Sequence, residues 1–193
     1  MRVNVNDGAI GRAAGFHVAF VVSDVDRRAA EYQRLLGGSF HSWEFVKAPP
    51  VDIDATLTDS HLRVAYGRFA GMTIELIQVL SGRGIHAAWF EEHGEGVHHL
   101  GFWVPELAPA LAASLQCGAT LISAKLDRDR VDWTDVDSQP PDHVAGCLLP
   151  GAIHIRYGVP SVELELLGPS TVAELHNRLG DQLHEIVDLP PWA

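Results

Sequence analysis

Two histidines and two glutamates recur at matching places along this sequence. His17 and His99 each open a short run of branched and aromatic residues, and Glu75 and Glu165 each interrupt a later apolar run. Two imidazoles and two carboxylates together suit a borderline divalent ion such as Zn, Ni, Co, Mn or Fe. We therefore expect these four side chains to bind one divalent metal ion, with water or substrate oxygens in its remaining positions.

Each of these residues taken alone has a simpler explanation. A single histidine on an apolar strand, such as His17, is more often a core residue with a satisfied ring. A single glutamate such as Glu75 more often lies on the wet face of its strand, because burying an unpaired carboxylate is costly. The repetition of the pattern in both halves of the chain favours the metal site.

The repetition extends beyond the four residues. Residues 16–22 and 98–104 are similar when His17 is aligned with His99, and both runs are typical of β-strands. In each half, a helix-like segment and a stop glycine follow the histidine after nearly the same interval. Such repetition indicates paired structural units. If the units pair by approximate two-fold symmetry, both histidines and both glutamates converge on one cavity.

Helices are predicted where apolar residues recur on one helical face. The main segments are 24–36, with Ser23 as the N-cap, and 105–116. A shorter helix is expected at 85–92, and the tail has helical spacing over 170–186. We expect this C-terminal helix to pack on the outside of the sheet or on a partner subunit.

Further strands are predicted from short apolar and β-branched runs. They are 39–45, 61–69 and 73–80 in the first half, and 119–123, 144–149, 153–157 and 162–167 in the second. Residues 125–143 are charged and contain proline, so we expect a long loop there, either a lid or a surface excursion.

Strand geometry restricts which neighbouring side chains can share the site. Successive residues of a strand point to opposite faces, so His98 is expected to point away from His99 and to stay outside the cavity. The same periodicity cannot separate Glu165 from Glu163, because both lie on one face. Glu165 lies at the same interval from its preceding turn as Glu75 does. This favours Glu165 as the fourth ligand and leaves Glu163 as the alternative.

These elements predict an α+β fold in which two tandem βαβββ modules form a curved mixed sheet around a metal cavity, with an additional C-terminal helix. A chain of 193 residues suits two small halves that share a core. The expected parts are an N-terminal extension at 1–15, a first module at 16–80, a linker at 81–96, a second module at 97–168, and a C-terminal helix and tail at 169–193.

The composition argues against several classes of partner. The formal charge of −11 disfavours nucleic acid and anionic membranes, which require basic patches. No apolar run approaches the roughly 18 residues of a membrane span, and the first residues do not read as a signal peptide. Cys117 and Cys147 are too few for a disulfide framework. We expect a cytoplasmic protein that acts on a small molecule.

Residues 94–104, which read Gly-Glu-Gly-Val-His-His-Leu-Gly-Phe-Trp-Val, resemble the central motif of methylmalonyl-CoA epimerases. Those enzymes belong to the vicinal oxygen chelate superfamily, together with glyoxalase I, extradiol dioxygenases and the fosfomycin- and bleomycin-resistance proteins. Further elements of that superfamily are similar to residues 17–26, 32–37, 74–76 and 164–166, so the resemblance covers about residues 16–168.

The resemblance implies a set of metal ligands, a homodimer and a reaction. The ligands would be His17, Glu75, His99 and Glu165, with Glu163 as the alternative. Four ligands of this kind are similar to those of epimerases and glyoxalase I, whereas extradiol dioxygenases use two histidines and one carboxylate. The implied reaction is that of an isomerase or lyase, which removes a proton α to a metal-bound carbonyl of a small acyl or thioester-like substrate. A ligating carboxylate, Glu165 or Glu75, would be the base.

Two other functions fit the resemblance as well. One is an Fe(II) dioxygenase that acts on a ring or a ketoacid, and the other is a binding protein that sequesters a small molecule without chemistry. The chain also departs from the epimerases, which carry a base on the strand before the second ligand, where residues 62–65 read Leu-Arg-Val-Ala. His61 is a nearby substitute. Trp43, Trp89, Trp103 and Phe102 are candidates for the pocket wall, although an aromatic residue of this kind is more often a core residue.

Overall fold

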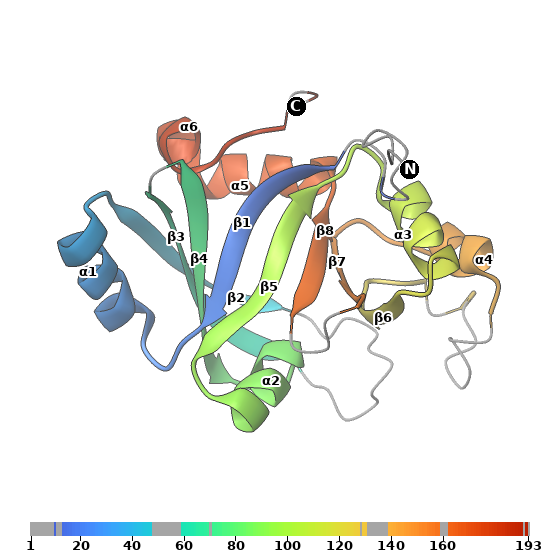
Figure 1. Cartoon of the computed structure of the whole chain (residues 1–193), viewed down its shortest axis with the longest axis horizontal. Helices are drawn as coiled ribbons and strands as arrows, with labels where there is room; N and C mark the ends of the chain where they lie inside the picture. Colours follow the sequence, from blue (N-terminus) through green and yellow to red (C-terminus); the bar gives the residue numbers. More distant parts are fainter. Residues whose placement is uncertain are drawn as a thin grey trace, which may run out of the picture.

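The structure, a computed structural model, describes residues 10, 13–47, 59–69, 71–127, 129–130, 139–158, 162–190 and 192. In this part of the chain, eight strands form one curved mixed sheet in the order β2-β3-β4-β1-β5-β8-β7-β6 (Figure 1). The strands are β1 (Ala14–Val21), β2 (Phe40–Lys47), β3 (Ser60–Phe69), β4 (Met72–Ser81), β5 (Gly96–Trp103), β6 (Thr120–Ser123), β7 (Ala152–Arg156) and β8 (Glu163–Leu167).

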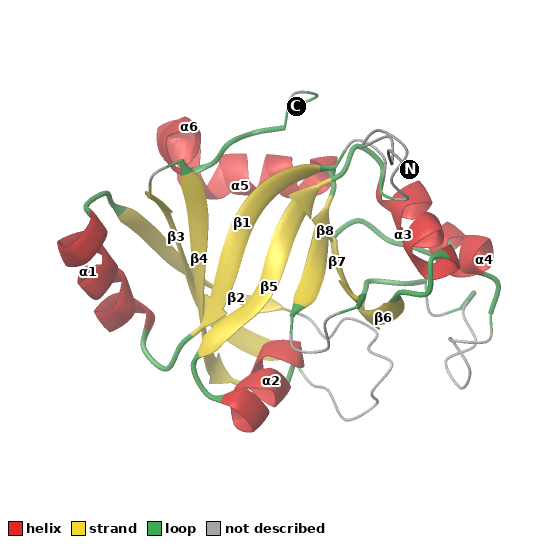
Figure 2. Cartoon of the chain, in the orientation of Figure 1, coloured by secondary structure: helices red, strands yellow, loops and turns green. Residues whose placement is uncertain are grey.

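Helices connect and cover these strands (Figure 2). They are α1 (Val25–Leu36), α2 (Ile85–His93), α3 (Leu107–Gln116), α4 (Pro141–Gly146), α5 (Pro169–Leu179), the 3₁₀ turn η2 (Gly180–Gln182) and α6 (Leu183–Ile186). The predicted α+β fold, with two tandem βαβββ modules and a C-terminal helix, is confirmed. The predicted module boundaries stay predictions.

Two antiparallel strands, β1 and β5, form the centre of the sheet and open the two modules. Each has the closing strand of its own module as a parallel neighbour on its other side, β4 beside β1 and β8 beside β5. The two halves of the sheet are therefore arranged alike around the β1–β5 pair. This arrangement lets residues from four strands meet at the middle of one face.

The start of α1 differs from the prediction. Asp24 is the N-cap, and its carboxylate accepts a hydrogen bond of 2.9 Å from the backbone N–H of Arg27. The predicted cap Ser23 is wrong because Glu95 binds it instead, accepting hydrogen bonds from both its backbone N–H and its hydroxyl. Gly37 ends the helix as expected, with a positive φ of 75°.

The strand predicted at 144–149 is also wrong, because α4 occupies the first half of that segment and only an isolated bridge at Leu148 follows. Pro140 is the N-cap and Pro141 is the first residue of the helix, a position that proline favours because its φ is already helical. Val144 and Ala145 then pack into the core beneath α3. A short apolar run does not by itself distinguish a buried helical turn from a strand. The predicted loop 125–143 lies partly outside the described residues.

The two faces of the sheet carry different side chains, as the alternation of β4 shows. Ile74 and Leu76 face outward and pack beneath α1. Glu75 and Ile77 face the opposite side, where they line a cavity. Helix α3 covers the outer face of the second module in the same way. The concave face is thus left for the C-terminal segment and the cavity.

The sequence suggested that the C-terminal helix packs on the outside of the sheet, and the structure places it on the concave face instead. Helix α5 lies behind the sheet in Figure 1 and lines the cavity. Leu183 of α6 is completely buried in the same core as Trp103. The indole N–H of Trp103 donates to the carbonyl of Asp188 at 3.0 Å, and the hydroxyl of Thr73 donates to that of Ile186 at 3.0 Å. The chain's own tail therefore covers the concave face.

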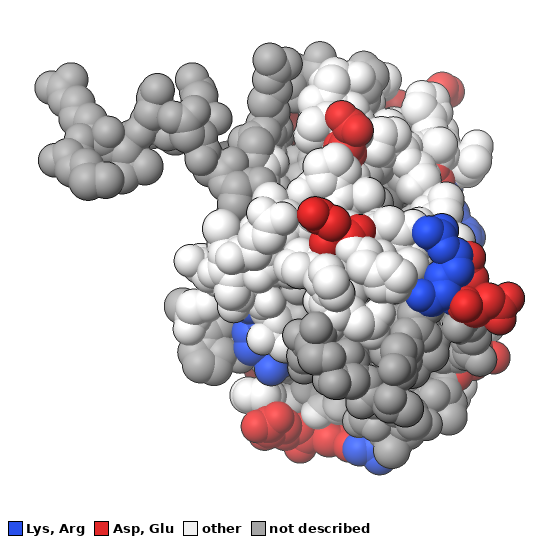
Figure 3. Space-filling view, turned by 90° about the vertical axis from the view of Figure 1, so that its right-hand side faces the viewer, with Lys and Arg blue, Asp and Glu red and all other residues white. Residues whose placement is uncertain are grey.

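The surface reflects the acidic composition. On the face shown in Figure 3, the described lysine and arginine side chains are few and lie beside acidic ones. Among the described helices, none has both the length and the apolar character that crossing a membrane would need. Cys117 and Cys147 are both free, in agreement with the absence of a predicted disulfide framework.

Candidate metal centre

The four residues singled out in the sequence meet on the concave face. The Nε2 atoms of His17 and His99 are 2.9 Å apart. An Oε2 atom of Glu75 lies 3.2 Å from His17 Nε2 and 3.5 Å from His99 Nε2. An Oε2 atom of Glu165 lies 3.3 Å from each of the two nitrogens. All four side chains are buried, so four donor atoms converge in a space shielded from water.

Strand register explains why these four meet. On the β1–β5 pair, His17 lies opposite Gly101 and His99 opposite Ala19. On the parallel pairs, the residue two places after each histidine lies beside a glutamate: Ala19 pairs with Glu75, and Gly101 with Glu165. The two halves thus place histidine and glutamate in equivalent positions, as the sequence repeat suggested.

The same register separates Glu165 from Glu163. Glu163 pairs with His99 on β5, and the equivalent partner of His17 on β4 is Thr73. Glu163 therefore occupies the place of a threonine, one step away from the four-residue group. Its Oε1 atom instead accepts a hydrogen bond of 3.1 Å from the Arg156 guanidinium.

The donor spacing fits one metal ion. Nitrogen and oxygen ligands lie about 2.0–2.2 Å from a zinc-like ion, which places neighbouring ligands about 3.0 Å apart at right angles and about 3.4 Å apart in a tetrahedron. The observed separations between the histidine and glutamate atoms run from 2.9 to 3.5 Å. Two imidazoles and two carboxylates also match the preferences of the divalent ions from manganese to zinc.

The pKa shifts of the four side chains also fit a bound divalent ion. Burial lowers the pKa of His17, but the carboxylates of Glu165 and Glu75 outweigh burial and raise it to about 9. Burial would raise the pKa of Glu75, yet the rings of His17 and His99 lower it to about 2. Against burial, His99 and His154 hold the pKa of Glu165 well below its usual range. Two ionised carboxylates therefore face the imidazoles, and one divalent ion replacing imidazole protons would balance their charge.

A cavity of about 480 Å³ is lined by three of the four residues, Glu75, His99 and Glu165. Strand β3 contributes Leu62, Val64 and Tyr66 to its wall, as expected for every second residue of a strand. The place where epimerases would carry a base is thus aliphatic. His61, the substitute considered in the sequence, does not line the cavity and contacts Glu44 at 3.3 Å.

Tyr66 is a site residue that the sequence reasoning missed. Its ring lies edge-on to His17, with 5.8 Å between centroids, and stacks on Trp43 at 5.4 Å. Burial, followed by the nearby charge of Glu75, raises the pKa of Tyr66 well above its usual value, so its hydroxyl stays protonated. Counting every second residue from Leu62 along the predicted strand 61–69 could have found it, because Leu62, Val64 and Tyr66 share one face. Of the four aromatic candidates for the pocket wall, Trp43 lines the cavity, whereas Trp103 is a core residue, the place that the sequence favoured.

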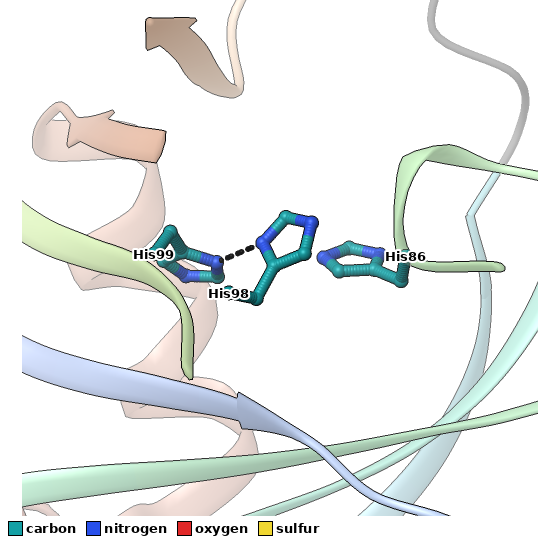
Figure 4. Close-up of side chains that lie close together, drawn as sticks. All are labelled: His86, His98 and His99. Atoms are coloured by element: carbon teal, nitrogen blue, oxygen red, sulfur yellow. Dashed lines mark hydrogen bonds between the residues drawn. The ribbon is translucent and has the colours of Figure 1, made fainter. Parts of the chain in front are cut away.

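Strand alternation predicted that His98 points away from His99, but the two rings lie side by side. The β1–β5 register is irregular between Ala19 and Phe20, so that Ala19 pairs with His99 while Phe20 pairs with Val97. A bulge of this kind re-aims the extra side chain. The Nδ1 atoms of His98 and His99 lie 2.9 Å apart, and His86 packs on the other side of the His98 ring (Figure 4).

Gly101 supports the His17 ring by having no side chain. A Cβ atom at this position would lie 2.6 Å from Nδ1 of His17, so Gly101→Ala must push the ring out of place. We expect this variant to bind Co²⁺ at least about tenfold more weakly, the lower end of the loss seen when a ligand's support is removed. Titration of the metal-free protein in competition with a chromophoric chelator measures the affinity.

Gly15→Ala is the matched control for this substitution. Gly15 lies on the same strand pair, and a Cβ atom at this position would enter open space. Unchanged Co²⁺ affinity in Gly101→Ala, or an equal loss in both variants, would contradict the role given to Gly101.

Comparisons with known proteins agree with the fold. A sequence profile described as the Glyoxalase/Bleomycin resistance protein/Dioxygenase superfamily matches residues 16–136. No curated protein sequence matches the chain. Methylmalonyl-CoA epimerase from Mycobacterium tuberculosis is similar in structure, with a TM-score of 0.52 and 17% identity, covering 90% of this chain and 97% of the epimerase.

Two further solved structures are similar. A triple mutant of 4-hydroxymandelate synthase from Streptomyces coelicolor has a TM-score of 0.55 and 17% identity, covering 86% of this chain and 52% of the synthase. The chain therefore spans about half the length of that protein. A hypothetical protein from Bacillus halodurans has a TM-score of 0.50 and 16% identity, covering 81% of this chain and 94% of its own. At sequence identities this low, the structural similarity shows a shared fold and nothing more.

Proposed function

This chain belongs to the glyoxalase, bleomycin resistance protein and dioxygenase superfamily, also called the vicinal oxygen chelate superfamily, and from that membership we propose that it is a metal-dependent isomerase or lyase. Its substrate would be a small acyl or thioester-like molecule that loses a proton α to a carbonyl. The observation that carries this proposal is the group of two histidines and two glutamates, three of which line a cavity.

The donor group and the cavity walls would have different roles in this reaction. His17, Glu75, His99 and Glu165 would hold a divalent ion, which would supply Lewis-acid stabilisation of the negative charge on a substrate carbonyl oxygen. The aliphatic and aromatic walls exclude water, which strengthens every electrostatic interaction in the cavity. A base must then accept the proton from the α-carbon while the C–H electron pair shifts toward the carbonyl. Return of the proton to the opposite side of the carbon completes an epimerisation.

Glu75 is the better placed of the two carboxylates to act as that base. Histidines contact Glu165 at both oxygens, because His154 Nε2 lies 3.3 Å from its Oε1 in addition to the two rings at Oε2. Of the two carboxylate oxygens of Glu75, only Oε2 is contacted by histidines of the described part of the chain. Glu165 would thus give up more contacts to turn toward a substrate. We assign Glu165 to binding and Glu75 to proton transfer.

The charge around the cavity indicates a class of substrate. Lys47 and Lys125 both line it, and neither forms an ion pair with another described residue. Ammonium groups that line a cavity favour a substrate with an anionic group. Among the acyl thioesters, we therefore expect those with a carboxylate or phosphate to react faster than neutral ones.

Exchange of the substrate α-proton with deuterated water tests the proposed function. The protein is loaded with Co²⁺, Mn²⁺ or Zn²⁺ and incubated with acyl-CoA esters, methylmalonyl-CoA first, and with hemithioacetals, and exchange is followed by NMR. We expect exchange with at least one substrate, abolished by a chelator and restored by the metal.

Other outcomes would identify the competing functions. Oxygen uptake that depends on Fe²⁺, without α-proton exchange, would indicate a dioxygenase instead. A protein that contains no metal and binds these compounds unchanged would be a sequestering protein. Either result would overturn the proposed reaction.

A further inference from the structure

Four buried polar atoms lie close together behind the candidate metal centre without a hydrogen-bond partner. They are His98 Nε2, both ring nitrogens of His154, and Glu163 Oε2. The histidines are at most 1% exposed, and Glu163 is 4% exposed. Burying polar groups without partners is costly, so a network of this kind is a poor way to stabilise a fold. Its position next to two of the proposed metal ligands suggests another reason for it.

The first connection runs from His99 to Glu163 through His98. If His99 gives the lone pair of Nε2 to a metal ion, the proton of its neutral ring is on Nδ1. That N–H then donates to Nδ1 of His98, 2.9 Å away. His98 must in turn carry its own proton on Nε2, which lies 3.9 Å from Glu163 Oε2. At this distance the last contact is electrostatic or bridged by water.

The second connection runs from Glu165 to the same Glu163. His154 places Nε2 at 3.3 Å from Glu165 Oε1 and Nδ1 at 3.5 Å from Glu163 Oε2. Glu163 is itself held by Arg156, whose guanidinium donates to Oε1 at 3.1 Å. One carboxylate therefore faces two histidines, and each histidine faces one member of the proposed donor group.

We propose that Glu163, anchored by Arg156, positions two of the four metal ligands through a pair of histidines: His98 orients the ring of His99, and His154 orients the carboxylate of Glu165. This inference rests on the proposed metal centre and adds four positioning residues to it. Outer contacts of this kind fix the tautomer of a ligating histidine and typically contribute 10–100-fold, roughly, to metal affinity. The β-bulge at His98 is what brings the ring beside His99.

The two amide replacements of His98 test the first connection sharply. The amide of asparagine lies near the position of Nδ1, so His98→Asn keeps an acceptor for His99. The amide of glutamine lies near the position of Nε2, so His98→Gln loses that acceptor while keeping a polar group toward Glu163. We expect Co²⁺ affinity to fall about 10–100-fold in His98→Gln and to be largely retained in His98→Asn. Titration against a chromophoric chelator measures it.

A second readout separates positioning from a general loss of structure. The visible absorption of bound Co²⁺ reports the arrangement of its ligands. At saturating Co²⁺, His98→Gln should show an altered spectrum, and His98→Asn should show the spectrum of the unchanged protein. His86→Asn is the matched control, since His86 is buried against the same ring, 4.7 Å from it, without a hydrogen bond to His99. It should leave Co²⁺ affinity unchanged.

Arg156→Gln tests the anchor with little risk to folding, because the Arg156 side chain is 43% exposed. We expect a weaker form of the His98→Gln effect.

Equal Co²⁺ affinity in all the variants would overturn the inference and leave the proposed metal centre intact. No Co²⁺ binding by the unchanged protein would overturn the metal centre itself. A second equivalent of Co²⁺ lost in His98→Asn would also overturn the inference, because His98 would then be a ligand of another ion, either with His154 and Glu163 or with His86 and His99.

Discussion

Glu165→Ala is expected to lose the bound divalent ion, while Glu163→Ala keeps it with reduced affinity. Glu165 Oε2 lies within 3.3 Å of both histidine nitrogens of the donor group, so its removal leaves an ion with three protein ligands and an unbalanced charge. Glu163 contacts the group only through other histidines. The loss in Glu165→Ala should therefore exceed the 10–100-fold, roughly, that an outer contact contributes.

Elemental analysis of the purified variants after dialysis measures this difference. Glu174→Ala is the matched control, because Glu174 also lines the cavity but belongs to α5 and pairs with Arg178 at 3.7 Å. Full metal content is expected in that variant. Unchanged metal content in both His17→Ala and His99→Ala would contradict the proposed metal centre.

The second large effect is expected in Glu75→Gln. Glutamine keeps an oxygen that can bind a metal but cannot accept a proton at neutral pH. With the metal supplied at saturating concentration, α-proton exchange should fall by about 10²–10⁴-fold, the usual contribution of a general base. The rate is measured under the same NMR conditions as for the unchanged protein, and metal content is determined on the same samples.

Glu165→Gln is the comparison that makes this result specific. If the assignment of roles is correct, Glu165→Gln binds metal more weakly but loses less of its exchange rate when the metal is saturating. The reverse order, with the larger catalytic loss in Glu165→Gln, would make Glu165 the base.

Much of the candidate site could be predicted from the sequence because its chemistry is local. His17 and His99 open similar strands, and Glu75 interrupts an apolar one, where a carboxylate needs a partner. Repetition of the pattern in both halves indicated convergence, and the structure brings the four residues together. The choice of Glu165 over Glu163 was weaker, because both lie on one strand face and only the interval from the preceding turn separated them.

Other features depended on residues far apart in the chain. The register of β8 against β5 is what places Glu165, and not Glu163, level with Gly101. The bulge opposite Ala19 turned His98 toward His99, against the simple alternation of a strand. A single-strand pattern contains no information on either, because register and bulges arise where two strands meet.

The sequence by itself determined the βαβββ repeat, the α+β class and the residue types of a metal centre, since hydrophobic periodicity and the cost of buried charge act within each segment. Only the tertiary structure decided that the C-terminal helix closes over the concave face, that Tyr66 joins the cavity, and that Glu163 lies behind the donor group with His98 and His154. Those features follow from packing between distant segments, which no local pattern encodes.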